Sequence, residues 1–297
     1  MERLARREML WLLVASIVAG AVRCVGLLEP SIWFDEAMSW RTSILPWDAM
    51  LRSLSRNSHP PLYFALLRLW VGAFGESAAA LRSMNVVISM LTPPFIWLFC
   101  REAASATEVG RNESARREDR DMFRRAALTA CLQFACSPFQ IRLVWEARMY
   151  PLFVLLTMLS SWLLLRAIAN PVSMMRWGCF AIASLGMLYT HYFAMFAVTG
   201  QFAFLACWTL TSADRLRKTR LCGVAVAAVI VVSGWALWLP VFLRQRQRVA
   251  DDWWTGKLTL GNVLESAADW VSSSRVFVDP MMAAACVVAL TIVIVGL

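Results

Sequence analysis

Long apolar stretches alternate with short polar segments along almost the whole chain of 297 residues. A helix that crosses the hydrocarbon core of a bilayer needs about 20 residues of this kind. The pattern therefore predicts an all-α polytopic membrane protein with about eight spans. The predicted spans are residues 9–28, 78–99, 126–139, 149–165, 174–188, 192–210, 221–243 and 281–297.

Two further segments are predicted to be helices that lie on the outer membrane surface. Residues 46–54 start with Pro46 and repeat apolar side chains at helical spacing. Residues 62–74 are apolar but shorter than a span, and they carry Arg68 at their centre. An amphipathic stretch from residue 260 to 271 is expected to lie on the same surface. The expected outer loops are residues 29–77 and 244–280.

The distribution of positive charge predicts the orientation of these helices. Hydrophobic residues make up 59% of the chain, yet its formal charge is +9. Arginines gather ahead of the first span, in residues 101–125, around residues 166–176 and in residues 215–220, and the positive-inside rule makes these segments cytoplasmic. Residues 101–125 also carry acids, which favours a solvated connector without chemistry. Because the charge is divided among loops, we expect the bilayer as a partner and no nucleic acid.

This orientation gathers many ionisable and aromatic polar residues on the outer side. Both histidines of the chain are among them. Charged groups held at a membrane surface indicate a functional site. The residues concerned are Asp35, Glu36, His59, Arg82, Glu146, Arg148, Tyr150, His191 and Tyr192.

Several short motifs carry a resemblance to a known family. Trp33-Phe34-Asp35-Glu36-Ala37, followed by His59-Pro60-Pro61-Leu62-Tyr63, resembles the first outer loop of the GT-C class of membrane glycosyltransferases. The similarity is to the dolichyl-phosphate-mannose protein mannosyltransferases and the lipid A aminoarabinose transferases, a branch similar to glycosyltransferase family 39. Further stretches resemble recurrent segments of that branch in the same order. They are Phe74-Gly75-Glu76 leading to Leu81-Arg82, Ser137-Pro138-Phe139 with Glu146-Ala147-Arg148-Met149-Tyr150, and Tyr189-Thr190-His191-Tyr192.

The resemblance implies a fold and a reaction. The fold would be a GT-C-type helical bundle with interfacial helices in the first outer loop, formed by residues 1–297 as one domain. The enzyme would move a sugar from a polyprenyl-phosphate donor to a hydroxyl of a lipid, protein or cell-envelope glycan acceptor at the outer face, with inversion. Direct displacement needs a single base, because the phosphate leaves without a proton.

The same resemblance implies residue roles. Asp35 would be the catalytic base, with Glu36 as its catalytic partner. Arginines suit the departing phosphate, because a guanidinium binds it through two hydrogen bonds. The expected substrate-binding residues are His59, Tyr63, Arg82, Glu146, Arg148, Tyr150, His191, Tyr192, Arg244, Arg246 and Arg248.

Structural interpretations of these residues stay open beside the functional ones. Asp35 is also suited to capping an outer-loop helix, and arginines at the interface are suited to snorkelling. Asp35, Glu36 and His59 include metal-ligand types, but the set is incomplete, so we predict no metal and no cofactor, with a divalent ion as the alternative.

Two departures from the family pattern affect the functional expectation. Trp145 stands where a polar residue is typical, and the chain ends inside an apolar stretch, so we expect it to lack the family's carboxyl-terminal part. The alternatives are a transporter or flippase of lipid-linked sugars, or an inactive fragment that acts as an assembly subunit.

Overall fold

The computed structural model describes residues 6–107, 113–211, 215–251 and 259–261. Within these ranges the chain is helical and contains no strand, which confirms the all-α fold class. Four helical segments of the described residues are long and apolar enough to cross a membrane. They are Ala78–Ser105, which comprises α5 (Ala78–Met90) and most of α6 (Thr92–Thr107), then α9 (Tyr150–Ala169), α11 (Ala194–Thr211) and α12 (Arg217–Ala236).

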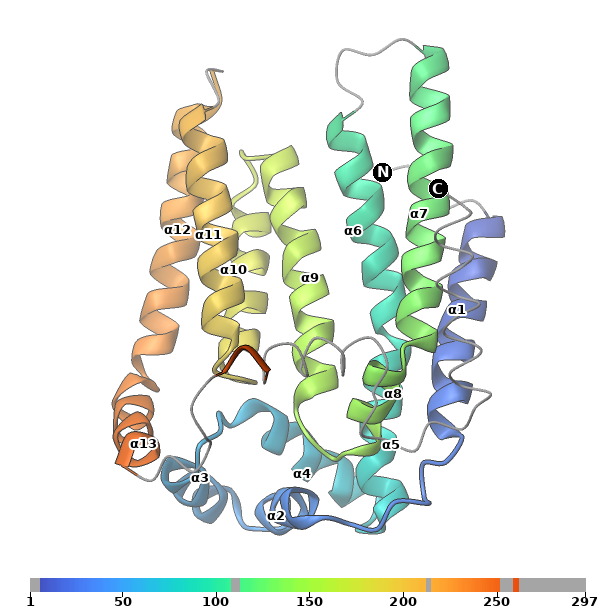
Figure 1. The fold of residues 1–297 in the computed structure, drawn as a ribbon. Helices are drawn as coiled ribbons and strands as arrows, with labels where there is room; N and C mark the ends of the chain where they lie inside the picture. Colours follow the sequence, from blue (N-terminus) through green and yellow to red (C-terminus); the bar gives the residue numbers. More distant parts are fainter. Residues whose placement is uncertain (1–5, 108–112, 212–214, 252–258, 262–297) are drawn as a thin grey trace.

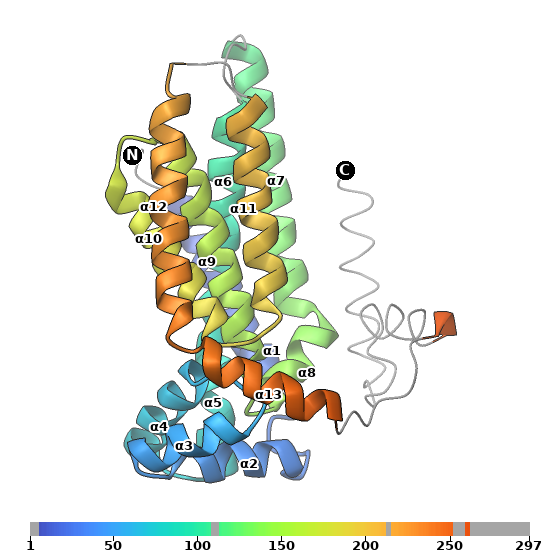
Figure 2. The same ribbon diagram turned by 90° about the vertical axis from the view of Figure 1, so that its left-hand side faces the viewer.

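The longer helices run side by side, and short helices lie across one end of them (Figures 1 and 2). These short helices are α2 (Phe34–Ser43), α3 (Trp47–Arg56), α4 (Leu62–Phe74) and α13 (Leu239–Asp251). We call this end the short-helix end. α6 and α11 end, and α7 and α12 begin, at the opposite end (Figure 1).

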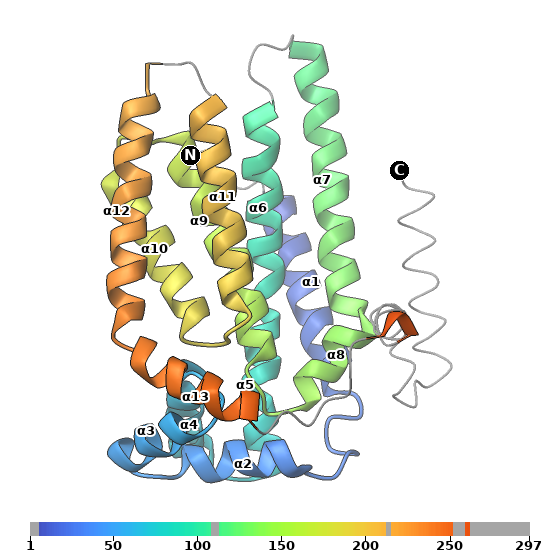
Figure 3. The ribbon, with the colours of Figure 1, turned by 60° about the vertical axis from the view of Figure 1, so that its left-hand side comes forward.

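The long helices form two groups, which meet where α6 packs against α9. α1 (Arg6–Cys24), α6 and α7 (Glu113–Cys136) form one group, and α9 to α12 form the other, with α10 spanning Met174–Leu188 (Figure 3). α8 (Pro138–Trp145) leads from α7 back towards the short-helix end. Each group has its own buried apolar cluster, one around Trp97 and one around Trp177.

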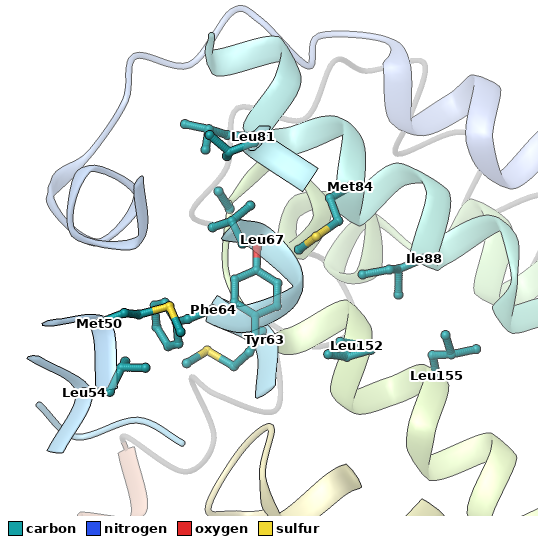
Figure 4. Close-up of a cluster of buried hydrophobic side chains, with 13 residues drawn as sticks. Met50, Leu54, Tyr63, Phe64, Leu67, Leu81, Met84, Ile88, Leu152 and Leu155 are labelled. Carbon is teal, nitrogen blue, oxygen red and sulfur yellow. The ribbon is translucent and has the colours of Figure 1, made fainter. Parts of the chain in front are cut away.

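A third apolar cluster joins the short helices to the bundle (Figure 4). Tyr63 and Leu67 of α4 are fully buried in it, between Leu54 of α3 and Leu152 of α9. Burying such side chains stabilises the fold by roughly 1.5–3 kcal/mol each. The cluster therefore holds α3 and α4 firmly against α5 and α9, close to the candidate site residues.

The two helices predicted outside the spans are confirmed as short helices. Residues 62–74 form α4 with the predicted bounds, and residues 46–54 correspond to α3. α4 lies at the short-helix end and does not run along the bundle (Figure 1). Arg68 donates to the backbone oxygens of Ser43 and Leu45. Its guanidinium therefore ties α4 to the connection between α2 and α3.

Residues 101–125, predicted as a connecting loop, are helical over most of their length. α6 continues to Thr107 and α7 already begins at Glu113. Acids and arginines at three- and four-residue spacing, such as Asp121 with Arg124 and Arg125, favour helix in a polar segment. The span predicted for residues 126–139 also ends early, because Ser137 caps a new helix that starts with Pro138.

The span predicted for residues 221–243 is wrong at its end. α12 stops at Ala236, and the chain turns through Leu237 and Trp238 into α13. Pro240 lacks a backbone N–H and suits the first turn of a new helix, which explains the break inside an apolar run. The predicted span at residues 281–297 and nearly all of the amphipathic stretch at 260–271 lie outside the described residues.

Candidate active site

Glu36 lies in the first turn of α2 and forms a buried ion pair with Arg82 of α5. Their side chains are 2% and 1% exposed. Arg82 Nη2 donates to Glu36 Oε2 at 2.8 Å, and Arg82 Nε donates to Oε1 at 2.9 Å. Glu36 Oε1 also accepts from the backbone N–H of Ala147 at 3.1 Å. Both carboxylate oxygens are therefore engaged in tying α2 to α5 and to the α8–α9 connection.

Arg82 uses all five of its N–H groups inside the protein. Two of them face Glu36, as described above. The other three donate to the backbone oxygens of Leu27 at 2.7 Å, Pro30 at 3.0 Å and Ser31 at 3.4 Å. A guanidinium has five donors and no acceptor, so none is left for a ligand. The structure places Arg82, which we expected to bind substrate, as an anchor for the segment between α1 and α2.

Arg148 is buried as well, but its donors are only partly used. The residue is 5% exposed and lies in the α8–α9 connection. Its Nη2 lies 2.9 Å from His59 Nε2 and 3.5 Å from Asp35 Oδ2. Its Nη1 reaches the backbone oxygen of Asp35 at 3.5 Å, and within the described part of the chain its Nε is buried without a hydrogen-bond partner. A buried cation with unused donors is suited to binding an anion.

Asp35 has surroundings opposite to those of its neighbour Glu36. Its side chain is 37% exposed and lies beside Arg148. The N-cap of α2 is Trp33, without a side-chain hydrogen bond, so Asp35 is not the capping residue. The first turn of a helix favours negative charge. Asp35 is thus a partly exposed carboxylate beside a guanidinium, and its exposed part leaves it accessible to a substrate hydroxyl.

The two histidines are neutral beside this arginine. An arginine only donates, so His59 Nε2 accepts from Arg148, and the His59 ring carries its proton on Nδ1. Burial, followed by the charges of Arg148 and His191, lowers the pKa of His59 to about 3. Burial and the charge of Arg148 lower the pKa of His191 to about 4. Near pH 7 neither ring adds to the positive charge of Arg148.

A pocket with a volume of about 290 Å³ opens beside the two histidines. The His191 ring lies 5.7 Å from Tyr150, 5.6 Å from Phe153 and 5.0 Å from Phe193, measured between ring centroids. The pocket connects the His59 turn, the α10–α11 turn and α13. Its remaining wall consists of Ser58, Tyr192, Phe193, Phe242, Gln245, Arg246 and Val249.

α13 forms one wall of this pocket and is held there by polar contacts. Gln245 is buried and donates from Nε2 to the backbone oxygen of Leu54 in α3 at 2.7 Å. Its Oε1 accepts from the hydroxyl of Tyr192, which in turn accepts from Trp238 Nε1 at 3.1 Å. Tyr192, which we expected to contact substrate, lines the pocket while its hydroxyl holds α13 in place.

The three arginines of α13 occupy different positions. Arg246 lines the pocket. Arg248 is exposed and donates to the backbone oxygen of Arg56 at 3.2 Å. Arg244 is exposed on α13 and does not belong to the pocket wall. Of the cluster expected to bind an anion, Arg246 is the member that borders the pocket.

Tyr63 and Glu146 lie away from the pocket. Tyr63 is fully buried in the cluster of Figure 4, and its hydroxyl donates to Asn85 Oδ1 at 3.4 Å. Burial raises the pKa of Tyr63, so it stays a neutral core residue. The Glu146 carboxylate faces Arg142 at 3.9 Å, and partial burial raises the pKa of Glu146 above its usual range.

The described side chains offer few free ligands for a metal ion. The described residues contain no group of three or more His, Cys, Asp or Glu side chains suited to a metal ion. Of the possible ligands considered above, Glu36 is engaged by Arg82, and His59 Nε2 by Arg148.

Trp145, the departure from the family pattern, has a structural role. Its Nε1 donates to the backbone oxygen of Arg23 at 3.0 Å. Its ring lies 3.4 Å from the position that a Cβ would occupy on Gly26, whose φ is +71°. The indole therefore packs on the turn after α1, where a left-handed backbone favours glycine.

Two residues of the site were missed from the sequence. Asn85 is fully buried in α5 and contacts the α8–α9 connection, and Gln245 holds α13. A signal for Asn85 was available, because Arg82, Asn85 and Ser89 repeat at helical spacing and all three are buried. Gln245 stands between exposed arginines, and nothing in the local pattern distinguishes it.

Comparison with known protein families gives no match, and neither does a search of curated proteins.

Proposed function

We propose that this chain is an integral membrane glycosyltransferase. It transfers a sugar from a polyprenyl-phosphate donor to an acceptor hydroxyl at the short-helix end of the bundle, with inversion. The observation that carries the proposal is the group formed by Asp35, Arg148 and His59, of which His59 also lines the pocket. It combines a partly exposed carboxylate, a buried cation with unused donors and a cavity of about 290 Å³ at the edge of an apolar bundle.

Each member of the group has a defined role in this proposal. Asp35 accepts the proton of the acceptor hydroxyl while that oxygen attacks the anomeric carbon. The bond between the anomeric carbon and the donor phosphate breaks, and the phosphate leaves with its electron pair. Arg148 stabilises the negative charge of that phosphate, with Arg246 in the pocket wall as a second cation. His59 holds the guanidinium of Arg148 through its neutral Nε2.

Glu36 and Arg82 take a different role from the one expected. Both are fully engaged with each other and with backbone groups, so we assign them to positioning the site and not to chemistry. Direct inversion needs one base, and Asp35 supplies it.

A reconstituted transfer assay tests the function. Purified protein in liposomes is given polyprenyl-phosphate mannose or polyprenyl-phosphate aminoarabinose together with soluble and lipid acceptors. The expected result is a glycosylated acceptor of inverted anomeric configuration and one equivalent of free polyprenyl phosphate. Movement of the intact donor across the bilayer, without cleavage, would instead support a transporter or flippase.

Arg148→Gln is expected to weaken binding of a polyprenyl monophosphate. A charge-assisted contact contributes about 1.5–3 kcal/mol, which corresponds to roughly ten- to a hundredfold in affinity. Equilibrium binding in nanodiscs measures it. Arg52→Gln is the matched control, because Arg52 lies at the same end of the molecule and pairs only at the surface with Asp48. Equal affinity in the two variants would show that Arg148 is not the phosphate ligand.

The short-helix end is expected to face the outer side of the membrane. The arginine-rich starts of α7 and α12 and the α9–α10 connection lie at the other end (Figure 1), and the positive-inside rule makes that end cytoplasmic. Single cysteines placed at Arg52 and at Arg217, in a chain without its native cysteines, test this with a membrane-impermeant reagent. External labelling at Arg52 and protection at Arg217 are expected, and the reverse pattern would overturn the orientation.

A further inference from the structure

The turn that carries Arg148 is held by hydrogen bonds to four of its backbone groups. The N–H of Arg148 donates to the backbone oxygen of Glu146 at 2.8 Å, which makes a tight turn centred on Ala147. The N–H of Ala147 donates to Glu36 Oε1. Asn85 Nδ2 donates to the backbone oxygens of Glu146 at 2.6 Å and of Arg148 at 3.0 Å. One side-chain amide of α5 thus binds the carbonyls of Glu146 and Arg148, on either side of Ala147.

Asparagine is chemically suited to this position. Its –NH₂ group has two hydrogens, one for each carbonyl, and a carboxylate of the same shape would present only acceptors. Asn85 is 0% exposed, so water does not replace these bonds if they are lost. Its Oδ1 accepts a longer bond of 3.4 Å from Tyr63, which keeps the amide oriented with Nδ2 towards the turn.

We propose that Asn85 is a positioning residue that sets the place of the Arg148 guanidinium beside Asp35 and His59. It acts through the backbone of the α8–α9 turn and touches no substrate. Arg148 lies 63 positions away from Asn85 in the sequence. The contact therefore fixes the turn relative to α5, a helix from another part of the chain. The consequence for donor binding rests on the proposed function, whereas the structural claim about the turn does not.

The first measurement is independent of any substrate. Asn85→Asp replaces two donors by acceptors that face two carbonyl oxygens, and Asn85→Ser serves as a second variant without added charge. Hydrogen–deuterium exchange of the peptide that covers residues 146–150 is expected to rise at least tenfold in both, while exchange in α12 and in the rest of α9 (151–169) stays unchanged. Ser89→Ala is the control, since Ser89 is buried in the same helix and lies outside the site. Unchanged exchange at residues 146–150 would overturn the proposal.

The second measurement asks whether Asn85 acts through Arg148. Affinity for a polyprenyl monophosphate is compared in the wild type, Asn85→Asp, Arg148→Gln and the double variant. Because Arg148 is displaced in Asn85→Asp, this variant is expected to bind the phosphate about tenfold more weakly than the wild type. The double variant is expected to bind no more weakly than Arg148→Gln, because two effects that act through one group do not add.

The outcomes separate the inference from the proposed function. Additive losses in the double variant, or normal affinity in Asn85→Asp despite raised exchange, would contradict positioning through Arg148. If the wild-type protein binds no polyprenyl phosphate, the proposed function fails, and the exchange experiment alone decides whether Asn85 holds the turn.

Discussion

Asp35→Asn is expected to abolish sugar transfer while the protein stays folded and inserted. The amide keeps the size of the carboxylate but cannot accept the proton of the acceptor hydroxyl, so the turnover rate should fall roughly a hundredfold or more. The side chain is 37% exposed and its closest cation is Arg148 at 3.5 Å, so the change should disturb packing little. Initial rates in the reconstituted assay measure the effect, and a thermal unfolding curve checks the fold.

Asp48→Asn is the matched control for this result. Asp48 also lies in the first turn of a short helix at the same end, and it pairs with Arg52 at the surface. Its replacement should leave the rate of transfer unchanged. Near-normal turnover in purified Asp35→Asn would remove Asp35 as the base. Loss of donor binding in that variant, without loss of rate at saturating donor, would indicate that Asp35 serves only to hold Arg148.

Arg82→Gln is expected to destabilise the protein strongly. Removing one member of a buried ion pair leaves the other charge without compensation, at a cost of about 3–5 kcal/mol. Three backbone oxygens in the α1–α2 connection would lose their donor as well. The free energy of unfolding, or the unfolding temperature in a fixed detergent, should fall accordingly. Removing an exposed pair, as in Arg52→Gln, should cost at most about 1 kcal/mol.

Two further variants separate stability from ligand binding. Glu36→Gln should also be destabilising, because Arg82 then keeps a buried charge without its carboxylate. The double variant Glu36→Gln/Arg82→Met should be more stable than Arg82→Gln, since neither charge remains. A stable Arg82→Gln protein that has lost affinity for polyprenyl phosphate would contradict the structural role and return Arg82 to the binding site.

The neighbouring acids of α2 show why a motif alone does not assign roles. Asp35 and Glu36 are adjacent in sequence, and successive residues of an α-helix point about 100° apart. The Glu36 side chain is directed into the protein against Arg82, whereas Asp35 stays partly exposed beside Arg148. Sequence reasoning placed both in the catalytic group. The structure engages the buried acid in an ion pair and leaves the partly exposed one accessible, which is why the proposal gives the chemistry to Asp35.

Local pattern was sufficient for much of the helical structure. The bounds of α4 were predicted from the two ends of an apolar run of 13 residues. Such a run can be read from the sequence because it depends only on the residues inside the segment. The grouping of polar residues at one end also followed from the order of apolar and charged segments. The errors occurred where a local signal competed with apolar character, as at Pro138 and Pro240, where a proline starts a new helix inside an apolar run.

The roles of the arginines were decided only by the tertiary structure. Arg82 and Arg148 are equivalent in sequence, since each is an arginine near an apolar stretch on the predicted outer side. Their hydrogen-bond partners lie 46 to 113 positions away, so no local pattern reveals that Arg82 is fully used and that Arg148 is not. The sequence by itself determined most of the long helices, the two short helices α3 and α4, and which end of the bundle collects the polar groups. Packing of distant segments decided which of those groups stay available for chemistry, because a donor that is used inside the protein cannot also bind a ligand.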